Sequence, residues 1–135
     1  MQRIGILGIC LFLIVSCGKD NSSFIPEVYV DYKISFVVFD QNDNADGVLI
    51  VNNQGYAGLI IRKTIGGYVA FDRCSSVDPE KKCAVTPDIG GITATDPCSG
   101  GKFFLLDGAA VKAPAVRPLK QYQVLVSSFE IAVIN

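Results

Sequence analysis

The distribution of apolar residues constrains the fold of this chain more than any other feature. β-Branched and aromatic residues occur in short runs, and clusters of turn-forming residues separate the runs. The runs occupy residues 32–39, 48–51, 59–63, 68–71, 122–126 and 129–134. No long segment combines the 3.6-residue period with the capping residues of a helix. The sequence therefore predicts an all-β domain, an antiparallel sandwich or barrel.

Residues 1–16 have the properties of a targeting segment. Arg3 supplies a positive charge, and residues 4–15 form an almost unbroken apolar run that is short for a bilayer span. The run ends in Ile-Val-Ser-Cys at residues 14–17, which resembles the lipobox of bacterial lipoproteins. In that family the signal is cut before the cysteine, and the cysteine sulfur carries a diacylglyceryl group. The alternative is an ordinary secretory signal in which Cys17 occurs by chance.

The lipoprotein resemblance implies three parts. These are a signal peptide at residues 1–16, a lipidated tether at 17–27, and a domain at 28–135. Acyl chains on Cys17 would hold the protein on a lipid bilayer, because each buried methylene contributes about 0.8 kcal/mol. In well-studied lipoproteins an aspartate directly after the cysteine retains the protein at the inner membrane, and this chain has Gly18 there. We therefore expect a lipid-anchored protein of the bacterial cell envelope, at the outer membrane.

The charge balance argues against a nucleic-acid partner. The chain has 12 basic and 13 acidic residues and a formal net charge of −1. Its Lys and Arg residues form no run and no basic patch interleaved with aromatic residues, which is the pattern that nucleic-acid binding requires.

The chain contains no histidine. Ser75 and Ser76 therefore have no imidazole to activate them, which excludes the usual serine hydrolase triad. Asp40, Asp43 and Asp46 lack the spacing and the closing glutamate of an EF-hand, so we expect them in a solvated turn. No paired carboxylates for general acid–base chemistry are evident. We expect no catalytic residue, no metal site and no enzymatic activity.

Three cysteines remain for the mature domain. Of the five in the chain, Cys10 leaves with the signal and Cys17 takes the lipid. Cys74, Cys83 and Cys98 are then an odd number in an oxidising compartment, which implies one disulfide and one free thiol. The pairings 83–98, 74–98 and 74–83 are all open on this argument.

Residues 56–134 resemble the domain of the Rieske 2Fe–2S proteins. The similar elements are, in order, a strand ending Tyr-Val-Ala-Phe-Asp at residues 68–72, a cysteine loop, a strand at 92–95, and Pro-Cys-Ser-Gly-Gly-Lys-Phe at 97–103. Residues 113–122 are similar to the segment G-P-A-x-x-P-L-x-x-Y that closes the cluster subdomain. The resemblance implies a Rieske-like antiparallel β-sandwich or barrel with a small loop-rich subdomain, the former cluster-binding region.

The ligand positions depart from the family pattern. A Rieske centre takes two thiolates on one iron and two imidazoles on the other. In the first loop the two ligand positions hold Cys74 and Ser76. In the second loop, alignment on the following glycine and phenylalanine places Asp96 at the cysteine position and Ser99 at the histidine position. One ligand of four survives, so we expect no cofactor, with a 2Fe–2S cluster only if atypical ligands hold it.

The same resemblance favours one disulfide. Respiratory Rieske proteins have a second cysteine in each loop, and the two form a disulfide that clasps the loops. Cys98 matches one of them, and Cys83 is the candidate for the other, although residues 77–82 make the spacing longer than in the family. We therefore favour Cys83–Cys98, with Cys74 reduced or buried. The alternative roles for Cys74 are a redox-active thiol and a partial metal ligand.

Three hypotheses for the function follow. The first is a membrane-anchored lipoprotein whose Rieske-like domain has lost its 2Fe–2S cluster and acts as a structural or binding module, with an envelope protein as its partner. The second is an iron–sulfur electron-transfer protein with atypical ligands, including Cys74 and Asp96. The third is a generic β-sandwich adhesin or ligand-binding lipoprotein.

Overall fold

The computed structural model describes residues 25–135. The expected signal peptide (1–16), the acylation site Cys17 and most of the expected tether (17–27) lie outside these residues. Within residues 25–135, no helix is long and apolar enough to cross a membrane. The first described residues pack on the domain: Ile25 is buried, and Lys120 Nζ lies 2.8 Å from a carboxylate oxygen of Glu27.

A six-stranded antiparallel sheet forms the larger part of the domain, in the order β1-β10-β9-β4-β3-β2. Its strands are β1 (Asp31–Ser35), β2 (Val48–Val51), β3 (Leu59–Thr64), β4 (Gly67–Asp72), β9 (Gln121–Val126) and β10 (Glu130–Ile134). The predicted strands at 48–51, 59–63, 68–71, 122–126 and 129–134 agree with five of these within a residue or two. Of the two C-terminal strands, β10 pairs with β1 and β9 pairs with β4, so the end of the chain lies inside the sheet.

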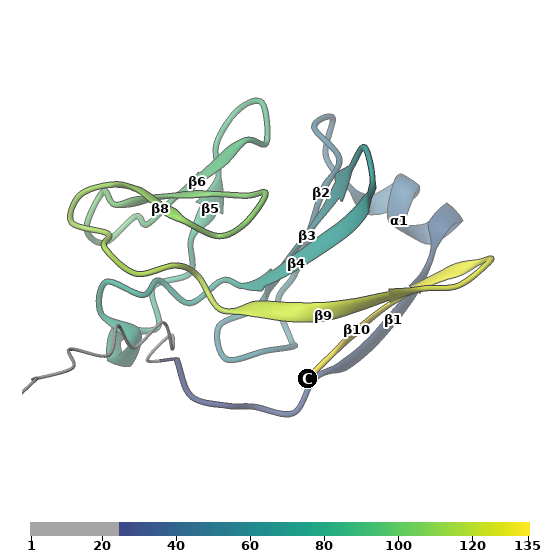
Figure 1. The fold of residues 1–135 in the computed structure, drawn as a ribbon, viewed down its shortest axis with the longest axis horizontal. Coiled ribbons are helices and arrows are strands. Elements are labelled where there is room, and N and C mark those ends of the chain that lie inside the picture. The colour runs from purple at the N-terminus through teal and green to yellow at the C-terminus, as the bar shows by residue number, and fades with distance from the viewer. Residues whose placement is uncertain (1–24) are drawn as a thin grey trace, which may run out of the picture.

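A smaller four-stranded sheet lies beside one end of the larger sheet (Figure 1). It comprises β5 (Thr86–Pro87), β6 (Thr93–Thr95), β7 (Lys102–Phe104) and β8 (Ala110–Lys112). These strands have only two or three residues, and a 3-10 turn, η1 (Pro79–Lys81), precedes them. The predictions of an all-β class and of a small loop-rich subdomain are confirmed.

One predicted strand is partly wrong. Residues 32–39 were expected to be extended, but the chain forms a helix, α1 (Phe36–Asn42), directly after β1. The Ser35 hydroxyl caps the helix by accepting a hydrogen bond from the backbone N–H of Val38. Phe39 then points into the core with none of its surface exposed. Burial of Phe39 outweighs the β propensity of the local sequence, because tertiary packing overrides weak local preferences.

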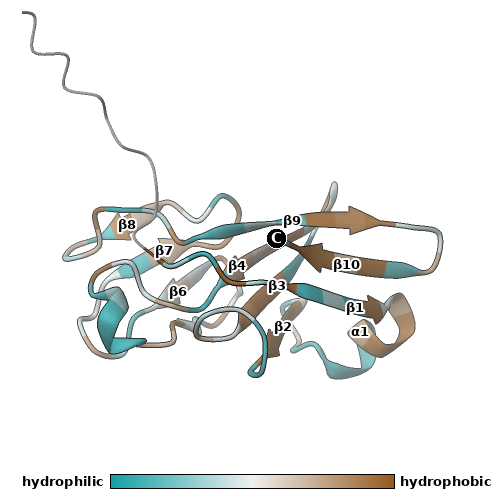
Figure 2. Ribbon diagram, turned by 90° about the horizontal axis from the view of Figure 1, so that it is seen from below, coloured by the Kyte–Doolittle hydropathy of each residue, from teal (hydrophilic) through white to brown (hydrophobic). Residues whose placement is uncertain are grey.

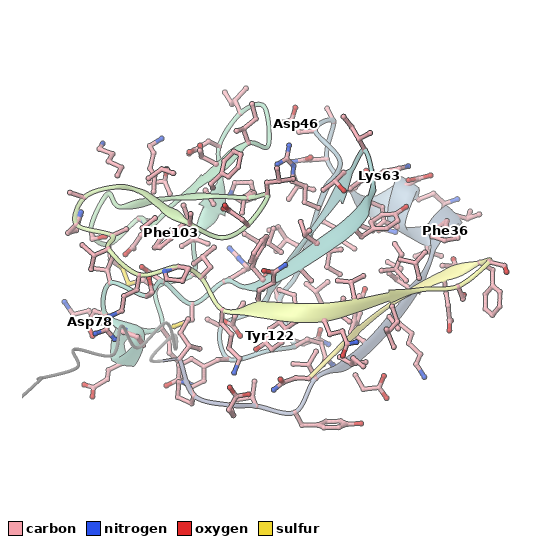
Figure 3. The ribbon with its side chains drawn as sticks, in the orientation of Figure 1. Phe36, Asp46, Lys63, Asp78, Phe103 and Tyr122 are labelled. Carbon is pink, nitrogen blue, oxygen red and sulfur yellow. A yellow bond between two sulfur atoms is a disulfide. The ribbon has the colours of Figure 1, made fainter. Side chains whose placement is uncertain are left out.

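Two hydrophobic clusters lie on the two faces of the larger sheet, and β3 contributes to both. Leu59 and Ile61 belong to the cluster under α1, whereas Ile60 belongs to the cluster shared with the smaller sheet. Both faces of β3 are therefore buried, which explains its unbroken apolar run. Figure 2 shows the hydrophobic strands in brown, and Figure 3 places Phe103 inside the smaller subdomain, in the second cluster.

Candidate functional site

The four positions aligned with cluster ligands lie in two loops that meet at the end of the smaller sheet. The first loop follows β4, and the second joins β6 to β7. Cys74 forms an isolated β-bridge with Ala84, which folds the first loop back on itself. In the second loop, Gly100 has a φ of +80° and closes a turn in which its N–H donates to the Asp96 carbonyl. The two loops thus present their side chains to each other.

A disulfide joins the loops through Cys83 and Cys98 (Figure 3, yellow bond). Cys74 keeps a free thiol. Of the three pairings that cysteine counting left open, the structure contains the one that the family resemblance favoured. The two bridged cysteines are 15 positions apart in the sequence.

Asp96 is the polar centre of the loop junction. One of its carboxylate oxygens accepts hydrogen bonds from the hydroxyls of Ser75, at 2.7 Å, and Ser99, at 2.6 Å. The other accepts from the backbone N–H of Cys98 at 2.8 Å. Asp96 and Ser75 are both buried. The carboxylate therefore ties one hydroxyl from each loop together, and the sequence pattern gave no signal for the part that Ser75 plays.

Ser76, the other hydroxyl at a ligand position, does not join this network. Its Oγ donates to the backbone carbonyl of Arg117 at 2.7 Å. It therefore fastens the first loop to residues 113–122, the segment similar to the one that closes the family's subdomain. The structure brings Asp96 and Ser99 together and directs Ser76 elsewhere.

Cys74 is buried, and the charge of Lys82, which favours the thiolate, is outweighed by other influences on its pKa. Its Sγ lies 3.7 Å from the carbonyl oxygen of Ser75 and 3.5 Å from that of Pro79. Burial, together with the negative charge of Asp72, raises the pKa of the Cys74 thiol to about 12. The thiol is therefore protonated at neutral pH, which disfavours a redox-active or nucleophilic role.

Sequence reasoning missed Asp72, the last residue of β4. It is fully buried and accepts hydrogen bonds from the backbone N–H groups of Tyr56, Ala57 and Cys74 and from the Tyr122 hydroxyl. Burial and the hydrogen bond to Asp72 raise the pKa of Tyr122, so this hydroxyl remains a donor. Three of the four donors come from distant parts of the chain, and local sequence patterns carry no signal for that convergence.

The network around Asp96 predicts a pH-dependent contribution to stability. Burial raises the pKa of this carboxyl, but the hydrogen bonds from the Ser75 and Ser99 hydroxyls, together with those from the backbone N–H groups of Cys98 and Ser99, outweigh burial and lower the pKa overall. A carboxyl whose pKa is lower in the folded state stabilises the fold above its unfolded value of about 3.9, and this contribution is lost as pH falls through the folded value. We expect Ser75→Ala to lower the free energy of unfolding by about 2 kcal/mol at pH 7 and by clearly less at pH 3.

The matched control for this prediction is Ser76→Ala. It removes a hydroxyl hydrogen bond of the same length, but to a carbonyl that does not titrate. Its effect on unfolding should therefore be the same at pH 7 and pH 3. Urea unfolding followed by circular dichroism at both pH values measures the two differences. A Ser75→Ala effect that is equal at pH 7 and pH 3 would contradict the role assigned to Asp96.

The residues at the junction do not fit a Rieske cluster of the usual kind. The full sequence offers no imidazole for the second iron. The Cys83 and Cys98 sulfurs are bonded to each other, and Cys74 is buried as a free thiol. One group of ligand-type atoms is nevertheless close together: a sulfur from each of Cys83 and Cys98 and a carboxylate oxygen of Asp96 lie within 4.8 Å of one another.

Comparison with known proteins identifies the fold. No family model matches the sequence, and no curated protein is significantly similar to it. Among solved structures, the plasma membrane Rieske protein of Synechocystis PCC 6803 is similar at a TM-score of 0.56 and 23% identity, over 81% of this chain and 100% of that one.

Two further solved structures agree. The ferredoxin of carbazole 1,9a-dioxygenase from Nocardioides aromaticivorans IC177 is similar at a TM-score of 0.53 and 20% identity, over 79% of this chain and 95% of that one. A chain in a complex of reduced oxygenase and oxidised ferredoxin in carbazole 1,9a-dioxygenase is similar at a TM-score of 0.52 and 24% identity, over 78% of this chain and 93% of that one. At these identities the likeness establishes the fold.

The comparisons correct one expectation from the sequence, that the protein has no cofactor. The solved structures with a similar fold include ferredoxins and a Rieske protein, and the structure gathers Cys83, Asp96 and Cys98 into one group with metal-ligand atoms. That expectation rested on comparing each of the four aligned positions separately with the family's ligand at that position. It overlooked that the two disulfide cysteines and Asp96 meet in space, so the missing histidines by themselves do not establish a protein without a cofactor.

Proposed function

For this domain with a Rieske-type fold, we propose a role as a non-enzymatic structural or binding module, anchored by acylated Cys17 in the bacterial cell envelope, at the outer membrane. We further propose that the family's two-thiolate, two-imidazole cluster site has been lost, and that an envelope protein is the partner. The sequence at residues 14–17 supports the anchor, and the fold of a membrane Rieske protein supports an envelope location.

The observation that carries the proposal is the chemistry of the loop junction. Where the family has four ligands facing an iron pair, this chain has a disulfide between the loops and a carboxylate that binds one hydroxyl from each loop. These contacts satisfy the buried polar groups within the protein itself. The junction therefore supports a rigid scaffold with a fixed loop surface.

A second candidate is an iron–sulfur electron-transfer protein with atypical ligands. The group of Cys83, Asp96 and Cys98 favours it, because thiolates and carboxylates both bind iron. Reduction of the disulfide by a dithiol would convert it into two thiols and free both sulfur atoms, with oxidation of the dithiol as the balancing reaction. An iron centre there would use a different set of atoms from the family site.

Anaerobic isolation of the full chain from bacterial membranes distinguishes the two candidates. The measurements are iron, acid-labile sulfide, visible absorption and the mass of the N-terminal peptide, with Cys17→Ser as the control for acylation. The module predicts none of the visible absorption of a two-thiolate, two-imidazole 2Fe–2S cluster, and it predicts an acylated Cys17. Stoichiometric iron and sulfide that are lost in Cys83→Ser would contradict the module and support the second candidate. A Cys17 peptide without lipid would overturn the anchor.

A further inference from the structure

A cavity of about 440 Å³ lies between the tip of the β3–β4 hairpin and the smaller subdomain. Arg62 and Thr64 of β3 line one side, the turn residue Ile65 lies at the rim, and Ile92 and Phe104 line the other side. In Figure 1 the hairpin tip and the loop before β6 both point to the top of the view, whereas η1 lies at the lower left. The cavity is thus separate from the disulfide junction.

The walls of the cavity are mostly apolar, and its rim is unusually exposed. Ile65 is fully exposed at the tip of the hairpin, and the side chains of Ile92 and Leu106 are about half exposed. These three residues come from two different parts of the fold and converge on one opening. Ligand sites in proteins share this character, an apolar concave surface of several hundred Å³ with few polar groups.

Arg62 gives the cavity its polarity. Its Nε is buried and has no hydrogen-bond partner in the part of the chain that the structure describes. The residues that line the cavity include no Asp or Glu, so they carry one positive charge and no negative one. A buried donor without an acceptor is costly, especially when it belongs to a charged group. The cavity therefore offers one positive charge, with no acidic partner among its lining residues, beside an apolar wall.

We propose that this cavity binds a small amphiphilic anion, an organic acid with an apolar body. Its carboxylate accepts hydrogen bonds from Arg62, because the guanidinium edge presents parallel N–H groups that match the two oxygens. The Thr64 hydroxyl is the second polar group within reach of the head. The apolar body packs on Ile92, Phe104 and Leu106, which removes their exposed surface from water.

Lys63 provides a natural comparison on the same hairpin. It carries the same charge one residue away, but its Nζ bonds to the Asp40 carboxylate at 3.1 Å, and Figure 3 shows it on the side of α1. Strand alternation directs neighbouring side chains to opposite faces, so Lys63 does not line the cavity. Loss of the Lys63 charge tests general attraction of anions, whereas loss of the Arg62 charge tests the cavity.

The experiment is a calorimetric titration of the full chain in phosphatidylcholine nanodiscs with 4-phenylbutyrate, with empty nanodiscs as the blank. We expect saturable binding of one molecule per chain and at least tenfold weaker binding of the neutral 4-phenylbutanamide. Arg62→Met should weaken 4-phenylbutyrate binding at least tenfold, and Lys63→Met should leave it unchanged. Arg62→Lys should fall between, because a lysine keeps the charge but lacks the fork of donors.

Folding of the variants is checked by their thermal unfolding, which Arg62→Met should not lower, since the Nε that it removes makes no hydrogen bond. Backbone amide shifts on titration should be confined to residues 62–66, 92 and 104–106. Equal binding of acid and amide, equal binding by Arg62→Met, or no saturable binding would each overturn the proposal. Binding of an acidic peptide without binding of 4-phenylbutyrate would also overturn it and make the surface a protein interface. The proposal does not depend on acylation or on the state of the disulfide.

Discussion

Asp72→Ala is expected to lower the free energy of unfolding by about 4 kcal/mol, the largest effect of any single substitution considered. The carboxylate is fully buried and accepts four hydrogen bonds. Alanine would leave three backbone N–H groups and the Tyr122 hydroxyl without acceptors. Denaturant unfolding followed by circular dichroism measures the loss, since the chain has no tryptophan to report on it.

Two controls separate the hydrogen bonds from the loss of volume. Asp72→Asn keeps the shape but turns an amide NH₂ toward N–H donors, so we expect an intermediate loss of about 2 kcal/mol. Tyr122→Phe removes one of the four hydrogen bonds and should cost about 1 kcal/mol. If Asp72→Ala cost no more than Tyr122→Phe, the carboxylate would not be the organising centre that the structure indicates.

The double variant Cys83→Ser, Cys98→Ser is expected to lose about 3 kcal/mol of stability. A bridge that closes a loop of 15 residues restricts the unfolded chain, and its removal restores that freedom. The two loops would then be held mainly by the hydrogen bonds of Asp96. Chemical denaturation of the oxidised wild type and of the double variant measures the difference.

Reduction of the wild type by dithiothreitol should reproduce the effect of the double variant. Cys74→Ala is the matched control, because it removes a cysteine from the same loop and leaves the bridge intact. Because its bridge is intact, Cys74→Ala should lose as much stability on reduction as the wild type does, whereas the double variant should not respond to dithiothreitol. A double variant as stable as the oxidised wild type would show that the loops are clasped by other contacts.

Much of the sheet followed from local pattern. β2, β3 and β9 coincide with apolar runs that turn residues interrupt, and such runs report directly on the spacing of strands. The helix α1 was missed because Phe36, Val37 and Val38 have high β propensity, whereas the helix depends on the Ser35 cap and on a core position for Phe39. The β propensity of a short segment is a weak energetic preference, and burial in a core built from distant strands outweighs it.

For the site, too, the sequence predicted one part and the tertiary structure was needed for the other. Alignment of the loops identified Cys74, Ser76, Asp96 and Ser99 as positions of interest, but it gave no partners for them. Only the structure separates Ser76, bonded to a distant carbonyl, from Ser99, bonded to Asp96. Ser75, which alignment passed over, binds the same carboxylate oxygen as Ser99.

The sequence by itself determined the β class, the short strands and the lack of any imidazole, because composition and the period of apolar residues are properties of the chain alone. Tertiary structure decided which cysteines pair, which donors reach Asp72, and that an arginine of β3 lines an apolar cavity between the β3–β4 hairpin tip and the smaller subdomain. Those features join residues that are far apart along the chain. Their contacts exist only once the two sheets have packed, since no local preference encodes a distance across the core.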